Sequence, residues 1–312
     1  MEKKNLRRRS NWYIYLISFA ATIVLLGLFI LAFRDTLFPQ NTGGGVPDWR
    51  SFANYTPEAE LDVTVLFMMG DEQGSVPNNY MLLNYRPRDE AVVVVPINSD
   101  TVLTTGSDEG WRNTSSSVKI TELYQNGGAT KVIEGIAGAL GVECDFYIHF
   151  DRSSFSGFMS SLGEVQVNIP YDFSGGGLKL EAGEHKLSGG DLFVYMNNAN
   201  FPEADVGEDY DLVIMGTAIT TLINSNCRHM DAEAIQNAFG KIRNNATTNL
   251  TFKDYTDYQR ALFYTSVNSI NPAIYYVPFG QYEPDGFVLS EQSVAEIWSR
   301  FKLIKTGSGH DR

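Results

Sequence analysis

The sequence predicts a layered α/β domain, with a central mixed β-sheet covered by helices on both faces, preceded by one transmembrane helix. Three observations support this prediction. An uncharged apolar run fills residues 11–33, runs rich in β-branched residues follow it, and these alternate with segments whose apolar residues recur at helical spacing. The 312 residues are 43% hydrophobic and 12% aromatic, which excludes a wholly disordered or fibrous chain.

The charge is divided unevenly along the chain. Residues 1–35 hold six basic and two acidic side chains, a net charge of +4, whereas residues 36–312 hold 18 basic and 35 acidic ones, a net charge of −17. The acidic balance argues against nucleic-acid binding, because phosphates require a basic face. Two cysteines, Cys144 and Cys227, are too few for a disulfide scaffold or a cysteine-ligated metal site, and the sequence leaves open whether they pair.

Residues 11–33 are predicted to cross a membrane. As a helix, 23 uncharged residues reach across a hydrocarbon core of roughly 30 Å. The basic residues within 1–10 should stay cytoplasmic, so we expect a single-pass protein of the cell membrane with an extracellular C-terminal domain. A cleaved signal peptide is the rival interpretation, but its apolar core is only about 7–15 residues long and residues 31–35 make a poor cleavage site.

The rest of the chain divides into three parts. Residues 34–58 form a linker, which the glycine run 43–45 makes flexible. Residues 59–304 form the extracellular domain, and residues 305–312 a flexible polar tail. No second apolar run is long enough to cross a membrane, so the domain is expected to be anchored by one helix alone.

The predicted strands come early and are strongly apolar. The runs 61–69, 80–85 and 91–97 are rich in β-branched residues, and the turn 86–89 separates the last two. Val92–Val95 lacks polar alternation, which predicts a strand buried on both faces. Further strands are expected at three places, namely 145–150, 164–169 and 274–278.

The predicted helices follow from apolar spacing and from capping residues. Residues 130–140 space their apolar side chains at i, i+3 and i+4. Asp231 is a predicted N-cap for residues 231–243, and Ser290 for residues 290–301. The remaining predicted helices are 155–162, 189–196 and 212–223, and the glycine run 175–177 marks a turn.

Several segments, taken in order, resemble one family of bacterial envelope proteins, the LytR-CpsA-Psr (LCP) family. The segments that carry the resemblance are KITELYQNGG at 119–128, GVECDFY at 141–147, Phe158 with LGEV at 162–165, LSG through Tyr195 at 187–195, and NLTF at 249–252, where the family's late helix begins. The resemblance covers residues from about 60 to the end of the chain.

The resemblance implies a chemistry. Members of this family transfer a glycopolymer from a polyprenyl-pyrophosphate carrier to peptidoglycan, which requires cations at the pyrophosphate and an apolar slot for the lipid. Partners implied in this way are a polyprenyl-linked glycan or other envelope proteins. The segments 132–140 and 212–223, which correspond to the slot, are apolar here, although ordinary core helices would be apolar as well.

The chain departs from the family at its basic motifs. Where the family has R-S-D-T, R-D-T, V-R-x-R and D-x-G-R-x-x-R-Q, this sequence has PNNY at 77–80, SDT at 99–101, MNNA at 196–199 and DVGEDYD at 205–211. No lysine or arginine occurs between Lys186 and Arg228, so no shift of the alignment restores one there. Acids in place of arginines would repel a pyrophosphate.

No catalytic residue is assigned with confidence, but family positions supply candidates. Asn79 and Asp100 occupy active-site positions of the family, and Asp100 is a possible ligand for Mg²⁺. The binding candidates are Asp71, Asp100, Thr101, Tyr195 and Asp205. His149 is interpreted as a hydrogen-bonded sheet residue rather than a metal ligand, because no other histidine lies at metal-ligand spacing.

Three hypotheses follow. The first is a catalytically degenerate member of the family that acts in binding or regulation during the attachment of cell-wall glycopolymers. The second is an active, metal-dependent transferase in which an acidic cluster holds Mg²⁺ in place of the arginines. The third is a sensor domain with an unrelated ligand.

Overall fold

The computed structural model describes residues 55–58, 61–70, 76–106, 115–198, 209–227 and 230–302. All of them belong to one compact unit, Arg50–Arg312. The predicted membrane segment 11–33, the tails 1–10 and 305–312, and most of the linker 34–58 lie outside the described residues. Within the described ranges, no helix is both long and apolar enough to cross a membrane.

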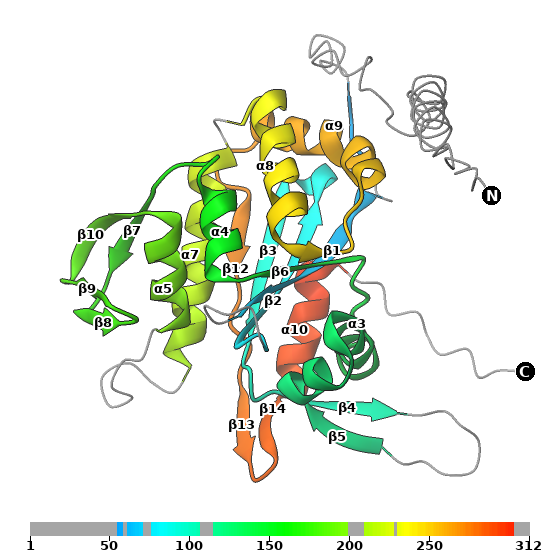
Figure 1. Cartoon of the computed structure of the whole chain (residues 1–312). Coiled ribbons are helices and arrows are strands. Elements are labelled where there is room, and N and C mark those ends of the chain that lie inside the picture. The colour runs from blue at the N-terminus through cyan, green and yellow to red at the C-terminus, as the bar shows by residue number, and fades with distance from the viewer. Residues whose placement is uncertain are drawn as a thin grey trace, which may run out of the picture. The chain divides into compact units, whose positions relative to one another are not determined.

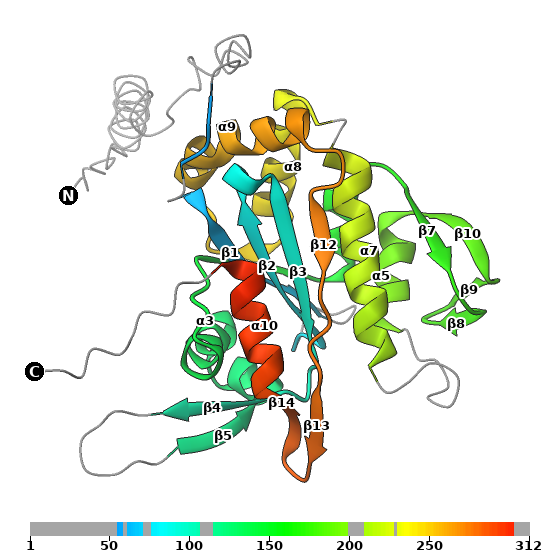
Figure 2. The ribbon, with the colours of Figure 1, turned by 180° about the vertical axis from the view of Figure 1, so that it is seen from behind.

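A six-stranded mixed sheet forms the centre of the domain (Figures 1 and 2). In spatial order its strands are β11 (Thr247–Thr248), β6 (Phe146–Phe150), β1 (Val63–Met69), β2 (Asn79–Arg86), β3 (Ala91–Ile97) and β12 (Ala273–Tyr275). Strands β1, β2 and β3 are antiparallel neighbours. The short helix η3 (Pro87–Asp89) joins β2 to β3 at the predicted turn. Strands β6 and β12 run parallel to β1 and β3, so the predicted mixed sheet is confirmed.

Both faces of the sheet are buried, as the run Val92–Val95 predicted. Val94 packs into the core cluster on one face, whereas Val93 and Val95 pack into the cluster on the other. Helices α4 (Arg152–Met159), α5 (Gly189–Asn197) and α7 (Tyr210–Cys227) cover the first face. Helices α3 (Ile120–Leu140) and α10 (Glu291–Phe301) cover the second.

Helix α3 begins ten residues earlier than its apolar spacing predicted. Its two halves meet at a break where Gly127 and Gly128 leave helical geometry, and Gly128 has φ 65°. Glycine lacks a Cβ and adopts this left-handed conformation at little cost, so the chain can bend there and continue as a helix. The first half carries the segment 119–128 on which the family resemblance partly rests.

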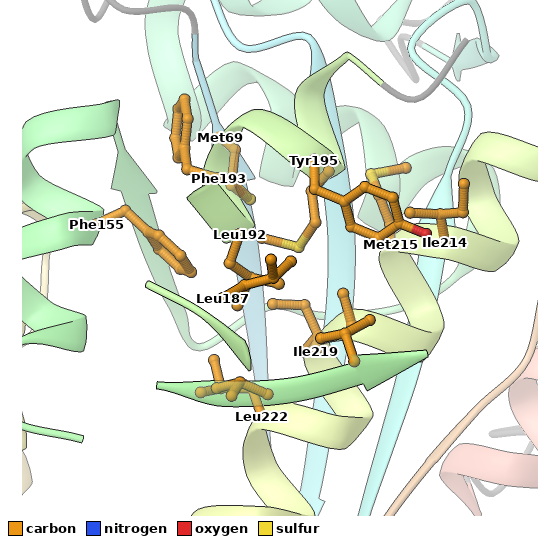
Figure 3. Packing of buried hydrophobic residues seen from close by; sticks show 14 of the residues in the cluster. Met69, Phe155, Leu187, Leu192, Phe193, Tyr195, Ile214, Met215, Ile219 and Leu222 are labelled. Atoms are coloured by element: carbon orange, nitrogen blue, oxygen red, sulfur yellow. The ribbon is translucent and has the colours of Figure 1, made fainter. Parts of the chain in front are cut away.

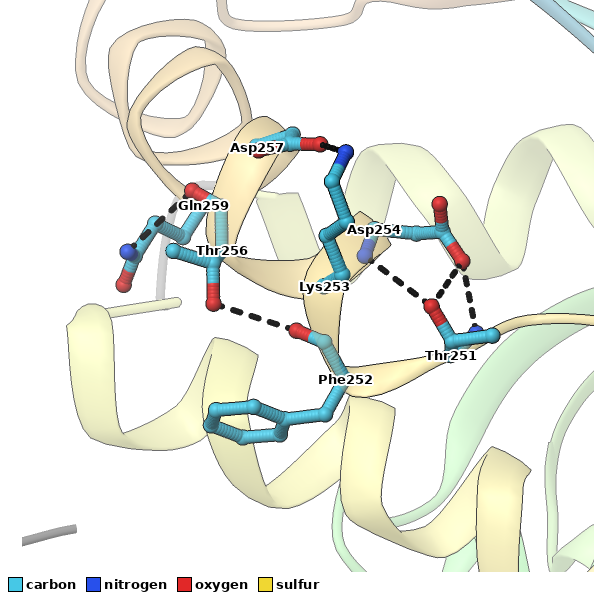
Figure 4. A network of polar contacts seen from close by, with 7 residues as sticks. All are labelled: Thr251, Phe252, Lys253, Asp254, Thr256, Asp257 and Gln259. Carbon is cyan, nitrogen blue, oxygen red and sulfur yellow. Dashed lines mark hydrogen bonds and ion pairs between the residues drawn. The ribbon is translucent and has the colours of Figure 1, made fainter. Parts of the chain in front are cut away.

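The starts of helices α8, α9 and α10 follow their capping residues. Asp231 accepts a hydrogen bond from the Ala234 amide at 2.8 Å and begins α8 (Ala232–Asn245), and Ser290 caps α10 in the same way, so both predicted caps are confirmed. At the start of α9 (Phe252–Asn268), Thr251 and Asp254 form a capping box (Figure 4).

Helix α4 begins three residues before its predicted start and ends three residues before its predicted end. Asp151 accepts a hydrogen bond from the Ser154 amide at 2.7 Å, and this capping box starts the helix. The prediction followed the apolar residues and overlooked the cap, which is why both boundaries were displaced.

In the described part of the chain, four two-stranded sheets lie outside the main sheet, and their strands were mostly not predicted. They are β4 (Val102–Gly106) with β5 (Ser115–Lys119), β7 (Val165–Ile169) with β10 (Gly183–Leu187), β8 (Phe173–Gly175) with β9 (Leu178–Leu180), and β13 (Gly280–Glu283) with β14 (Gly286–Leu289). The predicted strand 164–169 is therefore confirmed, but it pairs with β10 rather than joining the main sheet. Short polar strands carry little periodic signal, which explains the omissions.

Candidate functional site

Amide side chains gather at one end of the sheet. Asn79 begins β2 opposite the last residue of β1, and Asn98 directly follows β3, so strand pairing brings both to the same end. The Asn79 side-chain amide donates to Oδ1 of Asn197 at 2.7 Å, and the Asn197 amide donates to the Phe193 carbonyl at 2.9 Å. We call this end of the sheet, with Asn79, Asn98 and Asn197, the polar end.

Asn98 connects the polar end to two neighbouring segments. Its side-chain amide donates to the Tyr282 hydroxyl at 2.7 Å and lies 3.5 Å from Oδ1 of Asp209. Its side-chain oxygen accepts a hydrogen bond from the Asp100 backbone amide at 2.8 Å. Sequence reasoning missed Asn98, Asn197 and Tyr282 as site residues, because strand register, the end of α5 and the β13–β14 hairpin bring them together.

Asp100 is exposed and forms an ion pair with Lys119. The Lys119 ammonium lies 2.9 Å from Oδ1 of Asp100, and this contact raises the pKa of Lys119. Pairing of β4 with β5 places Val102 opposite Lys119, which brings the lysine beside Asp100. Lys119 was quoted in the sequence only as part of a motif, yet it supplies a positive charge at the polar end.

The other candidate residues lie in different surroundings. Thr101 is fully buried, and its Oγ1 has no hydrogen-bond partner among the described residues. Tyr195 points into the core, where its ring packs edge-on against Phe173 with 5.2 Å between centroids (Figure 3). Burial raises the pKa of Tyr195 to about 12. Asp71 and Asp205 lie outside the described residues.

The described residues do not fit a magnesium site. Mg²⁺ prefers several oxygen ligands in octahedral geometry. In the described part of the chain, no three histidine, cysteine or acidic side chains converge in a way that could hold a metal ion. The carboxylate of Asp100 is paired with the Lys119 ammonium. His149, in strand β6, shares a hydrogen bond at Nδ1 with the Tyr124 hydroxyl at 2.9 Å.

Asp211, at the start of α7, is a carboxylate whose ionisation the fold opposes. Burial is the main cause of its raised pKa, the Leu212 backbone amide acts in the opposite direction, and the neighbouring Asp209 raises the pKa further. The folded protein therefore binds this proton more tightly than the unfolded chain does. Stability from this group is complete below its ordinary pKa of 3.8 and is lost as pH rises through the raised value.

Asp211→Asn should therefore raise the melting temperature at pH 7 and leave it unchanged near pH 3.

Asp254 provides the opposite case. Burial acts to raise its pKa, but hydrogen bonds from Thr251 outweigh burial and lower the pKa. Asp254→Asn should lower the melting temperature at pH 7. Thermal unfolding of both variants at the two pH values tests the prediction, and a gain for Asp211→Asn at pH 3 would contradict it.

An apolar cavity of about 340 Å³ lies at the other end of the sheet, on the face covered by α4, α7 and α8. Val65, Leu83 and Val92 form its floor, at the end of the strands far from Asn79. The covering helices and α9 supply most of the rest of its lining, which comprises Tyr85, Phe158, Leu162, Leu222, Ile223, Asn226, Cys227, Met230, Ile235, Ala238, Phe239, Ile242, Leu262, Thr265, Ser266 and Pro272. Cys144 and Cys227 are both free.

Only one of the two apolar segments that corresponded to the family's slot borders this cavity. Leu222 and Ile223 of α7 line it. Residues 132–140 of α3 instead pack against the opposite face of the sheet, where Val132 and Ile136 are fully buried. Apolar spacing predicted that both helices bury a face, but it could not tell which side of the sheet each would cover.

Packed side chains separate the cavity from the polar end. Along β1 and β2, Phe67 and Met81 lie between the cavity floor and Asn79, over roughly 13 Å of strand. Phe155, Leu192 and Met215, which Figure 3 labels, belong to the same buried cluster and come from α4, α5 and α7. Each of these five side chains is at most 7% exposed. We call this packed stretch, with Phe67, Met81, Phe155, Leu192 and Met215, the plug.

Comparisons with known proteins agree with the resemblance found in the sequence. The model of the LytR_cpsA_psr family matches residues 51–302. A polyisoprenyl-teichoic acid–peptidoglycan teichoic acid transferase, TagU of Bacillus licheniformis, is 26% identical over 208 residues, which are 66% of this chain and 64% of that protein. TagU of Bacillus subtilis is 28% identical over 144 residues, 45% of each chain. The match therefore spans less than two thirds of either relative.

Solved structures share the fold. A putative transcription regulator from Eubacterium siraeum superposes with a TM-score of 0.70 at 18% identity, covering 81% of this chain and 95% of the other. TagV of Bacillus subtilis gives 0.63 at 18% identity, covering 77% and 96%. A structure of TagT bound to LI-WTA gives 0.59 at 16% identity, covering 80% and 94%. Because the family model matches most of the length of this chain, the chain belongs to the LytR-CpsA-Psr family.

Proposed function

We propose that this chain is a membrane-anchored extracellular protein of the bacterial cell envelope that holds a polyprenyl chain in its apolar cavity and does not transfer a glycopolymer. Its role would be binding or regulation in the attachment of cell-wall glycopolymers. The names of its TagU and TagV relatives support the setting, since they describe transfer of teichoic acid to peptidoglycan from a polyisoprenyl carrier. The apolar run at residues 11–33 supports the anchor and its orientation.

The plug is the observation that carries this proposal. A transferase must hold the pyrophosphate and the first isoprene units of the same molecule together. Here the cavity and the polar end lie on one face of the sheet, but Phe67 and Met81 fill the path between them. A lipid whose tail occupied the cavity could not place its pyrophosphate beside Asn79 unless the plug opened.

The charges at the polar end also argue against transfer of a glycopolymer. A pyrophosphate there would meet the amides of Asn79, Asn98 and Asn197, which are neutral, together with the carboxylates of Asp100 and Asp209. Among the described residues, Lys119 supplies a positive charge at this end, and Asp100 already neutralises it. Amides offer weaker contacts to phosphate than arginine forks do, and carboxylates repel it.

A second candidate function is an active transferase, and the exposed Asp100–Lys119 pair is the observation that favours it. Both residues occupy positions that match the family's motifs, and both reach solvent beside each other. If a metal ion displaced Lys119 from Asp100, the lysine would become available to a phosphate. This function requires acids from outside the described residues, such as Asp71 or Asp205, to complete the metal site.

One experiment separates the two functions. The full-length protein in mild detergent is assayed for transfer of a glycopolymer from polyprenyl pyrophosphate to peptidoglycan, with Mg²⁺ and with EDTA, beside TagU of Bacillus licheniformis as the active control. Lipid extracted from the same preparation is identified by mass spectrometry. We expect bound polyprenyl lipid without turnover. Turnover that requires Mg²⁺ and is lost in Asp100→Asn would establish the transferase instead.

A further inference from the structure

A surface of mixed polarity lies at the carboxyl end of α9. Its apolar residues, Met230, Phe263, Val267 and Ile270, line an open depression together with Asp231, Ser266 and Ser269. Val267 is 65% exposed and Ile270 is 59% exposed, the two highest values among the large apolar side chains described. Large exposed aliphatic side chains that stand next to each other commonly mark an interaction surface. We call the four apolar residues the α9 corner.

The α9 corner adjoins the apolar cavity. Met230 and Ser266 line both the open depression and the cavity beneath it. Tyr85 and Thr265, which share a buried hydrogen bond at 2.8 Å, stand just inside the cavity. Met230 and Ser266 therefore separate the depression from the cavity, and no charged side chain is among the cavity-lining residues.

The segment that precedes the first strand of the domain packs against α9, the helix that carries the α9 corner. The ring of Tyr55 packs against Tyr264 of α9 with 6.1 Å between centroids, and Leu61 packs into the small cluster that includes Ala261. Only residues 34–54 separate this point from the predicted membrane segment 11–33. Fully extended, that many residues reach at most about 75 Å, so the domain stays close to the membrane that holds the anchor, and the linker meets it on α9, the helix that carries the α9 corner.

We propose that the α9 corner docks on the phospholipid bilayer and opens the apolar cavity to the hydrocarbon interior. The exposed aliphatic side chains enter the boundary between headgroups and acyl chains, and the cavity behind them takes up a lipid tail without exposing it to water. Docking depends on apolar contact rather than on charge, because Asp231 stands at the rim and the outer part of the chain is acidic. Docking on the bilayer does not depend on the proposed function, whereas entry of a polyprenyl tail by this path rests on it.

The test compares two ends of the domain in the full-length protein. The β13–β14 hairpin lies at the end of the domain opposite α9 (Figures 1 and 2), and Gln281 in it is exposed. In a Cys144→Ser, Cys227→Ala background, Ile270→Cys and Gln281→Cys are labelled with the polarity-sensitive dye NBD and reconstituted into phosphatidylcholine vesicles. We expect the dye at position 270 to emit at shorter wavelength and to lose most of its emission to doxyl-labelled lipids, whereas the dye at position 281 should do neither.

A charge substitution checks the physical cause. Val267→Asp, combined with the label at position 270, should return the dye to the behaviour seen at position 281. Val267 is exposed, so this change should leave the fold intact. If the label at position 270 is not quenched by doxyl lipids, docking is overturned. If its emission shifts without quenching and follows the protein-to-lipid ratio, a second copy of the chain covers the surface, and the bilayer is likewise excluded.

The proposed function is judged separately on the same samples. Polyprenyl lipid found by mass spectrometry without quenching at position 270 would retain the proposed function and reject docking. Quenching without bound polyprenyl lipid would retain docking and reject the proposed function.

Discussion

Phe155→Ala should lower the free energy of unfolding by about 3–5 kcal/mol, the range expected for removal of a fully buried aromatic ring. Phe155 is 0% exposed at the centre of the plug. Its ring contacts Phe150, Phe158 and Phe193, with centroid separations of 5.6, 6.3 and 5.9 Å, and so joins α4 to β6 and α5. Urea unfolding followed by circular dichroism measures the loss.

Phe252→Ala is the matched control. Phe252 is 42% exposed at the start of α9, where its ring contacts Tyr255. Because much of this ring stays in water, we expect its removal to cost less than about 1 kcal/mol. Equal losses for the two variants would show that the plug is loosely packed, and the barrier between the cavity and the polar end would then need another explanation.

Phe155→Ala also tests the proposed function. Phe158, which contacts Phe155, lines the cavity, so truncation of Phe155 should extend the empty space towards the polar end. If the plug, rather than the acidic charge at the polar end, is what keeps a lipid head away from Asn79, this variant should retain more polyprenyl pyrophosphate per mole of protein than the parent chain does. Unchanged retention, measured by mass spectrometry on folded protein, would count against the plug as the barrier.

Ala238→Leu should reduce lipid binding several-fold while leaving the fold stable. Ala238 lies on α8 and its side chain lines the cavity, so three added carbon atoms enter empty space rather than packed core. We expect a change in the free energy of unfolding below about 1 kcal/mol, because overpacking is costly only where no space exists. Bound polyprenyl lipid should fall several-fold in extracts of the purified protein.

Ala218→Leu is the matched control, in which we expect stability to fall and lipid binding to stay unchanged. Ala218 lies on α7 in the same core cluster as the plug and is 0% exposed, but it does not line the cavity. The same substitution there should cost about 1–3 kcal/mol and leave the amount of bound lipid in the folded fraction unchanged. If Ala238→Leu proves as destabilising as Ala218→Leu, or if it keeps its lipid, the cavity is not the lipid site.

Part of the candidate site could be predicted from the sequence and part could not. Asn79 and Asp100 were found because they stand next to predicted strands at positions that match a family motif. Lys119, Asn98 and Tyr282 were missed because each joins the polar end through a partner distant in sequence: Lys119 meets Asp100 across the β4–β5 pair, and Tyr282 meets Asn98 from a late hairpin. A motif records which residue types are present, but not which of them face each other.

The sequence by itself determined the mixed sheet with both faces buried, the helix caps at Asp231 and Ser290, and the family. These features depend on local periodicity, local hydrogen bonds and residue identity. Only the tertiary structure decided that α7 borders the cavity while α3 covers the opposite face, and that Phe67 and Met81 close the path to Asn79. The physical reason is that apolar spacing shows a side chain will be buried, whereas strand register and helix placement, which join residues far apart in the chain, decide what it is buried against and where space is left.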